Sequence, residues 1–414
     1  MKEVVIISAV RTPVGRYMGA LKNIEAYDLA AMVLNSAVER ASISPDQVDE
    51  VVMGQSYQNG EYVNIARMAL LQAGWPDHIP GVTLDRRCCT GLEVVRYAAS
   101  LIRSNEAEII LAGGVESMSN TEFYLPGRIK WGVGGHGGMP KGHGDVSMWG
   151  LPFYDRIQRA RVMSQPQARY GVLPSMMSWA ETAAKEEDIS REACDQWAFE
   201  SHRKAVLAAS EDRFKDEILT LEIPDGRRGV IRMDADETPR PDTSIEKLAR
   251  LKPVLGGVCT AGNSSTESDG AAAVIVTSAE KARELGVEPL ASIESCAVVG
   301  GDPKRAYQTV PLAVKKALDV SQVTLDQIGR IEIQEAFAAQ VLADIKTMGI
   351  GDDDHGIINV NGSGISLGHP IACTGTRVLV TLLYEMKRGD VEFGMATICG
   401  GGGLGIASIL KKRQ

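Results

Sequence analysis

Several features that would place this chain of 414 residues in other protein classes are missing from it. No stretch approaches the roughly 20 apolar residues that a membrane-spanning helix requires, so we expect no membrane association. The seven cysteines contain no CxxC pair and no Cys/His cluster with zinc-binding spacing, which argues against a metal site. No glycine-rich stretch has the Walker or the dinucleotide-binding spacing.

Charge and aromatic content narrow the class further. A net charge of −9 argues against nucleic acid as the main partner. Aromatic residues make up only 5% of the chain while glycine occurs 43 times, a composition typical of a tightly packed α/β protein. No apolar leader segment follows Met1, and an odd number of cysteines suits free thiols in a reducing compartment. We therefore expect a cytoplasmic protein of two or three domains.

The chain contains an internal duplication. Residues 36–55 resemble residues 314–334, and each segment reads as a helix, a loop containing Asp-Gln, and a buried strand. The tripeptide Cys-Thr-Gly at 89–91 recurs at 373–375, at nearly the same separation, and an amphipathic helix and an apolar strand follow each copy. The two ends of the chain therefore read as two copies of one β/α unit.

The middle of the chain follows another pattern. Residues 120–174 show no sustained period, as in a long functional loop or an inserted region. Helices are predicted at 178–187 and 190–209, the second capped by Ser190. Residues 224–253 are charged and interrupted by proline, so we expect a surface excursion there.

These boundaries predict three domains. The N-terminal half comprises residues 1–119 plus 256–285, and residues 120–255 form an inserted loop domain. The C-terminal half comprises residues 286–414.

Cys88 lies where a strand-like run, 81–84, gives way to a helix-like run, 92–102. A sulfur at the start of a helix faces unpaired N–H groups and the positive end of the helix dipole, which favours the thiolate. The ordinary alternative for a free cysteine is a small buried hydrophobe. Since adjacent residues at a helix start point in different directions, we expect only one thiol to face the site, and its neighbour Cys89 to pack inward.

A second thiol and an imidazole sit in comparable surroundings. Cys399 ends an apolar run and opens the four glycines 400–403, which let the backbone come close to a ligand. His369 stands between glycine and proline and is a candidate base. Two thiols and one imidazole, each beside glycine, indicate acyl transfer through a thioester.

At these residues the chain resembles the thiolase family, and the resemblance runs nearly end to end. The resemblance implies an α/β protein with the thiolase fold, in which duplicated βαβαβαββ halves form a five-layered arrangement with an inserted loop domain. It also implies acyl transfer between CoA and acetyl-CoA. The family-like segments are Ser8–Pro13, Cys88–Gly91, Gly113–Ser119, Asp236–Arg240, Thr260–Ser265, Asp269–Ala273, Gln334–Ala338, Gly368–Pro370 and Cys399–Gly402.

The resemblance implies a role for each catalytic candidate. Cys88 would carry the acyl group, and the family register selects it over its neighbour. His369 would accept the Cys88 proton and donate a hydrogen bond to the thioester oxygen. Cys399, with a pKa expected near neutrality, would be the acid and base at the α-carbon. The N–H groups of Cys88 and Gly401 would stabilise an oxyanion, and Gln334 replaces the usual asparagine that holds a water.

Binding residues follow with less support from the motifs. Ser265 matches a residue that contacts the pantetheine arm in relatives, and Met176 loosely matches a pocket methionine. Arg227 and Arg228 are candidates for the phosphates of CoA, although basic turn residues are usually only solvated. We expect no metal and no cofactor, because CoA is itself a substrate, and we expect a homodimer or homotetramer.

Two other readings compete with a thiolase. A ketosynthase-like condensing enzyme typically combines one cysteine with two histidines, or with histidine and asparagine, so the second thiol at Cys399 argues against it. A non-catalytic acyl-CoA-binding subunit would lack the cysteine or the histidine, and both are present.

Overall fold

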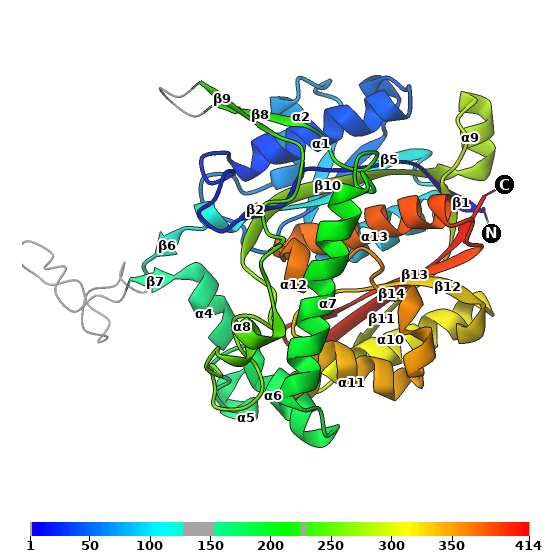
Figure 1. Ribbon diagram of the computed structural model, residues 1–414. Coiled ribbons are helices and arrows are strands. Elements are labelled where there is room, and N and C mark those ends of the chain that lie inside the picture. Colours follow the sequence, from blue (N-terminus) through cyan, green and yellow to red (C-terminus); the bar gives the residue numbers. More distant parts are fainter. Residues whose placement is uncertain (1, 127–152, 225–228, 414) are drawn as a thin grey trace, which may run out of the picture.

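A computed structural model describes residues 2–126, 153–224 and 229–413 (Figure 1). One large mixed sheet runs through it in the order β12-β13-β14-β11-β1-β10-β5-β3-β4, with β2 on the side of β10. Its first-half strands are β1 Val4–Arg11, β2 Gly15–Arg16, β3 Glu50–Gly54, β4 Gly81–Leu84, β5 Ile109–Ser117 and β10 Ser268–Ser278. Its second-half strands are β11 Ala291–Gly300, β12 Ile328–Ile333, β13 Phe393–Gly400 and β14 Leu404–Lys412.

Helices cover both halves of this sheet. Those of the first half are α1 Ala26–Arg40, α2 Ile65–Gln72, α3 Thr90–Ser104 and α9 Ala279–Leu285. Those of the second half are α10 Thr309–Ser321, α11 Ala338–Met348, α12 Gly364–Leu367 and α13 Ile371–Arg388. The segment between the halves contributes β6 Phe123–Tyr124, β7 Tyr154–Asp155, α4 Arg156–Val162, α5 Gln167–Tyr170, α6 Met177–Glu186, α7 Arg191–Ser210, β8 Leu221–Pro224, β9 Val230–Met233 and α8 Ile245–Ala249.

Three apolar clusters divide the described residues into five layers. The first cluster joins α1 and α2 to one face of the first-half strands, and the second joins the other face to α3 and α13. Within β1, Val5 and Ile7 belong to the first cluster and Val4 and Ile6 to the second, the alternation expected of a strand buried on both faces. The third cluster packs α10 and α11 against the second-half strands. Figure 1 shows α13 between β10 and β14, and the five-layered α/β fold is confirmed.

At two glycines, the backbones of the two central helices come into direct contact. A Cβ placed on Gly91 of α3 would lie 2.4 Å from the Thr376 nitrogen, and one on Gly375 of α13 would lie 2.4 Å from the Leu92 nitrogen. These are the two glycines of the repeated Cys-Thr-Gly tripeptide. Only glycine allows this approach, so the repeat marks the point where the halves meet.

The duplication extends to the local turns. Before β3, Ser44 and Gln47 form a capping box in which the Ser44 N–H donates to Gln47 Oε1 at 2.8 Å. Before β12, the Thr324 N–H donates to Gln327 Oε1 at 2.9 Å in the same arrangement. Both turns carry the Asp-Gln pair from which the sequence predicted the repeat, so that prediction is confirmed.

The second half departs from the first at one strand. Where the first half has β4, the second half has only a single bridge between Ile331 and Ile358. The Asn359 side chain explains the loss, because its Oδ1 accepts from the Ile333 N–H at 2.8 Å and its Nδ2 donates to the Ile333 carbonyl at 2.9 Å. A side-chain amide thus takes the place of a pairing strand.

The region between the halves is more ordered than its composition predicts. Within 120–174, the described residues include α4, which begins after Asp155, whose carboxylate accepts from the Ile157 N–H at 2.8 Å. Only Ile157 of this helix is buried, so no apolar period announces it. The helices predicted at 178–187 and 190–209 are confirmed as α6 and α7.

The sequence predicted only a surface excursion for residues 224–253, but part of this segment is anchored in the interior. Asp236 within them is buried against Arg11 of β1, with Arg11 Nη1 to Asp236 Oδ1 at 2.7 Å. Arg11 Nε also donates to Glu217 Oε1 at 2.7 Å, and both of those side chains are fully buried. The charge of Arg11 therefore fixes two separate segments of the insertion to the sheet.

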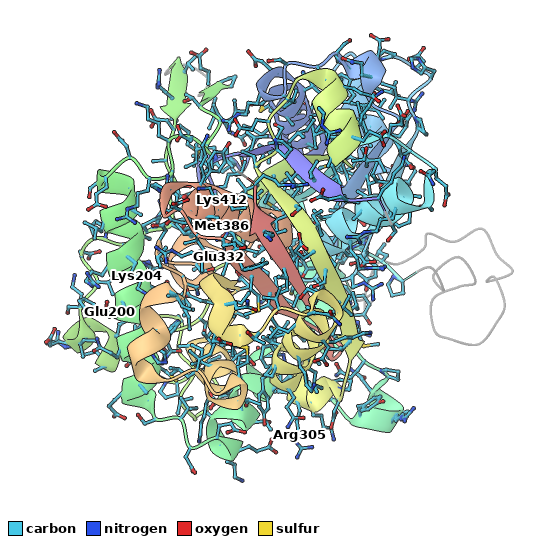
Figure 2. All side chains as sticks on the ribbon, turned by 90° about the vertical axis from the view of Figure 1, so that its right-hand side faces the viewer. Glu200, Lys204, Arg305, Glu332, Met386 and Lys412 are labelled. Atoms are coloured by element: carbon cyan, nitrogen blue, oxygen red, sulfur yellow. The ribbon has the colours of Figure 1, made fainter. Side chains whose placement is uncertain are left out.

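Figure 2 shows the contrast between interior and edge. Met386 of α13 is buried in the central cluster, whereas Arg305 lies at the outer edge. Arg305 Nη2 pairs with Glu186 Oε1 at 2.7 Å and so holds α6 against the second half.

The domain boundaries at 119, 255 and 285 stay predictions.

Replacing Gly91 with alanine should destabilise the fold at the upper end of roughly 1–3 kcal/mol, because the new Cβ meets backbone that no rotamer change can relieve. Denaturant unfolding followed by circular dichroism measures the loss. Gly300→Ala is the matched control, since a Cβ there meets nothing within 4 Å, and its midpoint should shift by less than about 0.5 kcal/mol. Equal midpoints for the two variants would contradict the close helix contact.

Candidate active site

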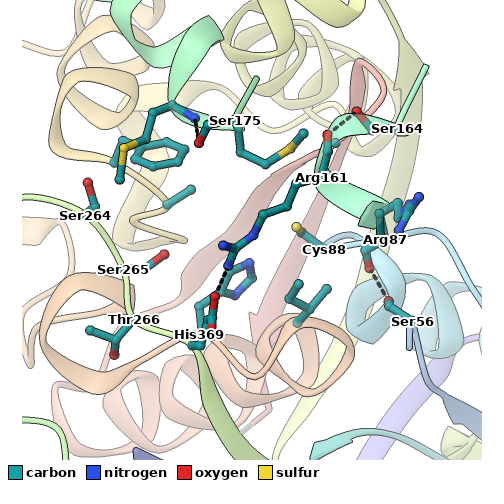
Figure 3. Close-up of a pocket in the computed structure, with 18 of the residues that line it drawn as sticks. Ser56, Arg87, Cys88, Arg161, Ser164, Ser175, Ser264, Ser265, Thr266 and His369 are labelled. Carbon is teal, nitrogen blue, oxygen red and sulfur yellow. Dashed lines mark hydrogen bonds and ion pairs between the residues drawn. The ribbon is translucent and has the colours of Figure 1, made fainter. Parts of the chain in front are cut away.

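A cavity of about 510 Å³ opens where α3, α13, β13 and the inserted segment meet (Figure 3). Most of its exposed wall area is apolar, and polar and charged side chains also line it, as in many ligand sites. Six residues singled out from the sequence line it: Cys88, Met176, Ser265, His369, Cys399 and Gly401.

Cys88 stands on a tight turn between β4 and α3. Arg87 has a positive φ of 54°, and its carbonyl accepts from the Ser56 hydroxyl at 3.1 Å. The Arg86 N–H donates to Thr90 Oγ1 at 2.7 Å, which closes the turn from the other side. Cys88 is thereby held at the cavity, and the Gly401 N–H donates towards its sulfur.

The expectation that the helix start favours the Cys88 thiolate is wrong. Burial raises the pKa of the Cys88 thiol above its ordinary value, although the Gly401 N–H and the Arg87 charge oppose the shift. The first helical residue is Thr90, so the sulfur lies just outside the helix terminus whose dipole was expected to stabilise it. Desolvation outweighs the dipole, and the resting group is a thiol.

Cys89 packs inward, as predicted. Its side chain is fully buried, and its sulfur donates to the Ile398 carbonyl at 3.5 Å. Burial raises its pKa well above the usual thiol range, so Cys89 does not compete as nucleophile.

His369 is fixed in one orientation and one tautomer. Its Nδ1 lies 2.7 Å from Thr374 Oγ1, and the Thr374 hydroxyl donates its single proton to the Pro370 carbonyl at 2.9 Å. This assigns the Nδ1–H as the donor and leaves the lone pair on Nε2. Nε2 has no partner among the described residues, so it is free to accept a proton in the cavity.

The imidazole is neutral at rest. Burial lowers the pKa of His369 to about 3, and the positive charges of Arg377 and Arg161 lower it further in the same direction. A neutral imidazole with a bare Nε2 beside a neutral thiol is the pair required for proton transfer from sulfur to nitrogen.

Cys399 is the second-last residue of β13 and is almost fully buried. The expectation of a pKa near neutrality is wrong, because burial raises the pKa of this thiol well above its usual range and the Asp344 carboxylate adds to the shift. The next residues leave the strand in a glycine turn in which Gly402 and Gly403 have φ of 88° and 78°. This turn brings Gly401 against Met176, since a Cβ on Gly401 would lie 3.1 Å from the Met176 sulfur.

Gln334 is not among the residues that line the cavity. Its side chain is buried, its Oε1 accepts from Arg377 Nη2 at 3.3 Å, and its amide nitrogen packs on Gly364. Its role as the holder of a water stays a prediction, but the amide is turned towards the interior. The next residue, Glu335, orients the loop, because it accepts from Trp197 Nε1 at 3.0 Å and from the Ser201 hydroxyl at 2.6 Å.

The candidate CoA contacts are only partly placed. Ser265 and Met176 line the cavity, whereas Arg227 and Arg228 lie outside the described residues. Within 2–126, 153–224 and 229–413, no group of three or more His, Cys, Asp or Glu side chains is arranged to hold a metal ion. In the same ranges, no helix is long and apolar enough to cross a bilayer.

Sequence reasoning missed a buried carboxyl that joins the loop after β3 to the start of α13. The buried Glu116 of β5 accepts from the N–H groups of Ser56 at 3.1 Å, Tyr57 at 3.0 Å and Ala372 at 3.1 Å. Burial raises the pKa of this carboxyl to about 7, while the three donors oppose the shift. Glu116 stands in a segment that the family resemblance included, but only the structure shows what it binds. Arg161 and Glu267 were also missed, and both line the cavity.

A duplicated five-layered α/β fold with two thiols and a neutral imidazole around one cavity defines a class of acyl-transferring enzymes that act through cysteine. The chain belongs to the thiolase family: the family model "Thiolase, N-terminal domain" matches residues 4–280, and "Thiolase, C-terminal domain" matches residues 287–412.

Individual relatives agree with this assignment. The chain is 40% identical to the acetyl-CoA acetyltransferase of Cupriavidus necator and 39% identical to that of Escherichia coli K12, over 100% of each chain. The crystal structure of the Bacillus anthracis acetyl-CoA acetyltransferase is similar with a TM-score of 0.90 and 38% identity, covering 100% of this chain and 99% of that one. Human mitochondrial 3-ketoacyl-CoA thiolase reaches the same TM-score at 32% identity, with the same coverage.

Alkylation of Cys88 by iodoacetamide should still accelerate above pH 9, the ordinary thiol value, because burial raises the pKa of this thiol. Inactivation rates measured across pH, with the site mapped by peptide mass spectrometry, test this. Arg87→Gln should slow alkylation at a fixed pH, since the Arg87 charge lowers the Cys88 pKa, whereas Arg213→Gln at the surface should not. A plateau at or below pH 7 would show that the thiolate prevails at rest.

Proposed function

We propose that this thiolase transfers an acyl group between CoA and acetyl-CoA, in the reaction 3-ketoacyl-CoA plus CoA to acyl-CoA plus acetyl-CoA and its reverse, through an acyl group on Cys88. The observation that carries this proposal is the meeting of Cys88, the bare Nε2 of His369 and Cys399 in one cavity. Membership of an acyltransferase family supports it throughout.

In the cleavage direction, the Cys88 thiol gives its proton to His369 Nε2 and its sulfur attacks the 3-keto carbon. The N–H groups of Cys88 and Gly401 receive the negative charge that develops on the keto oxygen. The bond between C2 and C3 then breaks, and acetyl-CoA leaves as an enolate that takes a proton from the Cys399 thiol.

The second half of the cycle restores both thiols. CoA gives its thiol proton to the Cys399 thiolate and attacks the acyl group on Cys88. The Cys88 sulfur leaves and regains its proton from His369. Because burial raises the pKa of both cysteines, each thiol is protonated before the step in which it gives up its proton.

The competing functions lack a supporting observation. A ketosynthase-like condensing enzyme has no use for a second cysteine at the α-carbon, and Cys399 lines the cavity. A non-catalytic acyl-CoA-binding subunit needs no bare imidazole nitrogen opposite a cysteine.

Assembly, location and binding residues form the rest of the proposal. We propose a homodimer or homotetramer, supported by β4 at the end of the strand order and by exposed Met68 and Leu71 on the adjoining α2. A cytoplasmic location is supported by seven free cysteines. CoA would be bound as a substrate along Ser265 and Met176, with no other cofactor, and its phosphates would meet Arg227 and Arg228.

Incubation with acyl-CoA should place the acyl group on Cys88, because the proposed base His369 lines the same cavity. Peptide mass spectrometry locates the adduct. Cys88→Ala should lower turnover by at least about ten-thousand-fold, as for other removed nucleophiles. Cys296→Ala, a thiol outside the cavity, should behave as the parent. An adduct on Cys89 would contradict the assignment.

Cys399→Ala should still accept an acyl group on Cys88, since that step uses His369, but carbon–carbon chemistry should fall roughly a hundred- to ten-thousand-fold without the α-carbon acid and base. Adduct formation and full thiolysis, measured separately, distinguish the two half-reactions. Equal loss of both would assign Cys399 a structural role or a role in activating the nucleophile.

A further inference from the structure

Two arginine side chains line the catalytic cavity beside the nucleophile. Figure 3 shows Cys88 between Arg161 and Arg87. The charge of Arg87 lowers the pKa of Cys88 and the charge of Arg161 lowers that of His369, so both cations act on the reacting groups. The mechanism above gives neither of them a task.

Arg161 extends from α4 into the cavity and is only partly satisfied there. One Nη group pairs with the Glu267 carboxylate, and the other donates to Gln158 Oε1 at 3.3 Å. A guanidinium carries five N–H donors, so donors remain for a ligand in the cavity.

Arg87 is held in place by its backbone. Its N–H donates to Asp85 Oδ1 at 2.7 Å and its carbonyl accepts from Ser56, which fixes the left-handed turn. Within the described part of the chain, the guanidinium of Arg87 forms no ion pair and no hydrogen bond. Its charge is therefore available to the cavity.

The charges on the cavity wall do not balance. Besides these two cations, Arg16 lines the cavity and pairs with Glu237, whereas Glu267 is the one acidic side chain among the described lining residues. The remaining walls include apolar side chains such as Met176 and Trp179. A purely hydrocarbon acyl chain in this space would desolvate guanidinium donors without replacing their hydrogen bonds, which is unfavourable.

We propose that the acyl group transferred by this enzyme carries a carboxylate, and that Arg161, assisted by Arg87, binds it. The substrates are then 3-ketoacyl-CoA thioesters with a carboxylated acyl chain. Arg161 presents the planar donor pair that matches a carboxylate. This inference rests on the proposed thiolase function and names its substrate class.

Glu267 predicts the direction in which a substitution should change the substrate preference. It is a carboxylate already bound to Arg161, so it competes with a substrate carboxylate for the same donors. Removing its charge frees Arg161, whereas removing Arg161 takes away the main donors for a substrate carboxylate and leaves only Arg87. The two substitutions should therefore move substrate preference in opposite directions.

The test compares thiolysis of two 3-ketoacyl-CoA esters with the same number of carbons, one ending in a carboxylate and one in a methyl group. The measured quantity is the ratio of their kcat/KM values, in which the CoA moiety cancels. The parent enzyme should favour the carboxylated ester at least tenfold. Arg161→Met should lower this ratio at least tenfold through KM, Arg161→Lys should lower it less, and Glu267→Gln should raise it. Arg213→Met, an exposed arginine paired with Glu211, is the control and should leave both constants unchanged.

The outcomes separate the possibilities. Opposite shifts of the ratio for Arg161→Met and Glu267→Gln support the inference. An unchanged ratio with an equal fall for both esters overturns it and assigns Arg161 to the shared reaction, to the CoA phosphates or to folding. A parent ratio of one or below also overturns it. If the parent cleaves neither ester nor acetoacetyl-CoA, the proposed thiolase function itself has failed.

Discussion

The backbone contact between Gly91 and Gly375 is the constraint on which the active site depends. The helix α3 starts immediately after the turn of Cys88, and α13 starts immediately after the turn of His369. Close packing of the two helix starts at these glycines brings Cys88 and His369 to one cavity. Glu116 adds an indirect link, because it accepts from the N–H groups of Ser56 and Ala372, and the Ser56 hydroxyl donates to the Arg87 carbonyl.

The same burial that builds the cavity sets its chemistry. It raises the pKa of both thiols and lowers that of the imidazole, so all three groups rest uncharged. Thr374 determines which nitrogen of His369 can accept a proton, because it bonds to Nδ1 and leaves Nε2 bare. In the proposed mechanism, charge therefore develops only during the reaction, where backbone N–H groups can receive it.

Local signals in the sequence predicted much of this fold. Ser190 caps a helix, and the Asp-Gln turns repeat, since both depend on neighbouring residues alone. The helix α4 was not predicted, because only Ile157 of it is buried and the sequence therefore shows no apolar period. The direction of the thiol pKa shifts was predicted wrongly, because the sequence shows where a helix starts but not how deeply a residue is buried.

The sequence also did not predict the orientation of the side chains of Gln334 and Arg161. Gln334 turns inward because Arg377 and Gly364 receive it, and these partners lie far along the chain. Arg161 reaches the cavity from a segment without a recognised motif. In both cases the deciding contacts come from other parts of the fold, which the pattern of one segment does not reveal.

The glycine contact also shows why a duplicated scaffold holds one such site and not two. At equal distances before the two paired glycines, the first copy has Cys88 where the second has Ala372, and the second has His369 where the first has Asp85. Two identical units would present each position twice, across an isologous interface. Because the two copies differ at both positions, the chain has Cys88 on one side of the glycine contact and His369 on the other, and a repeated scaffold builds one asymmetric site.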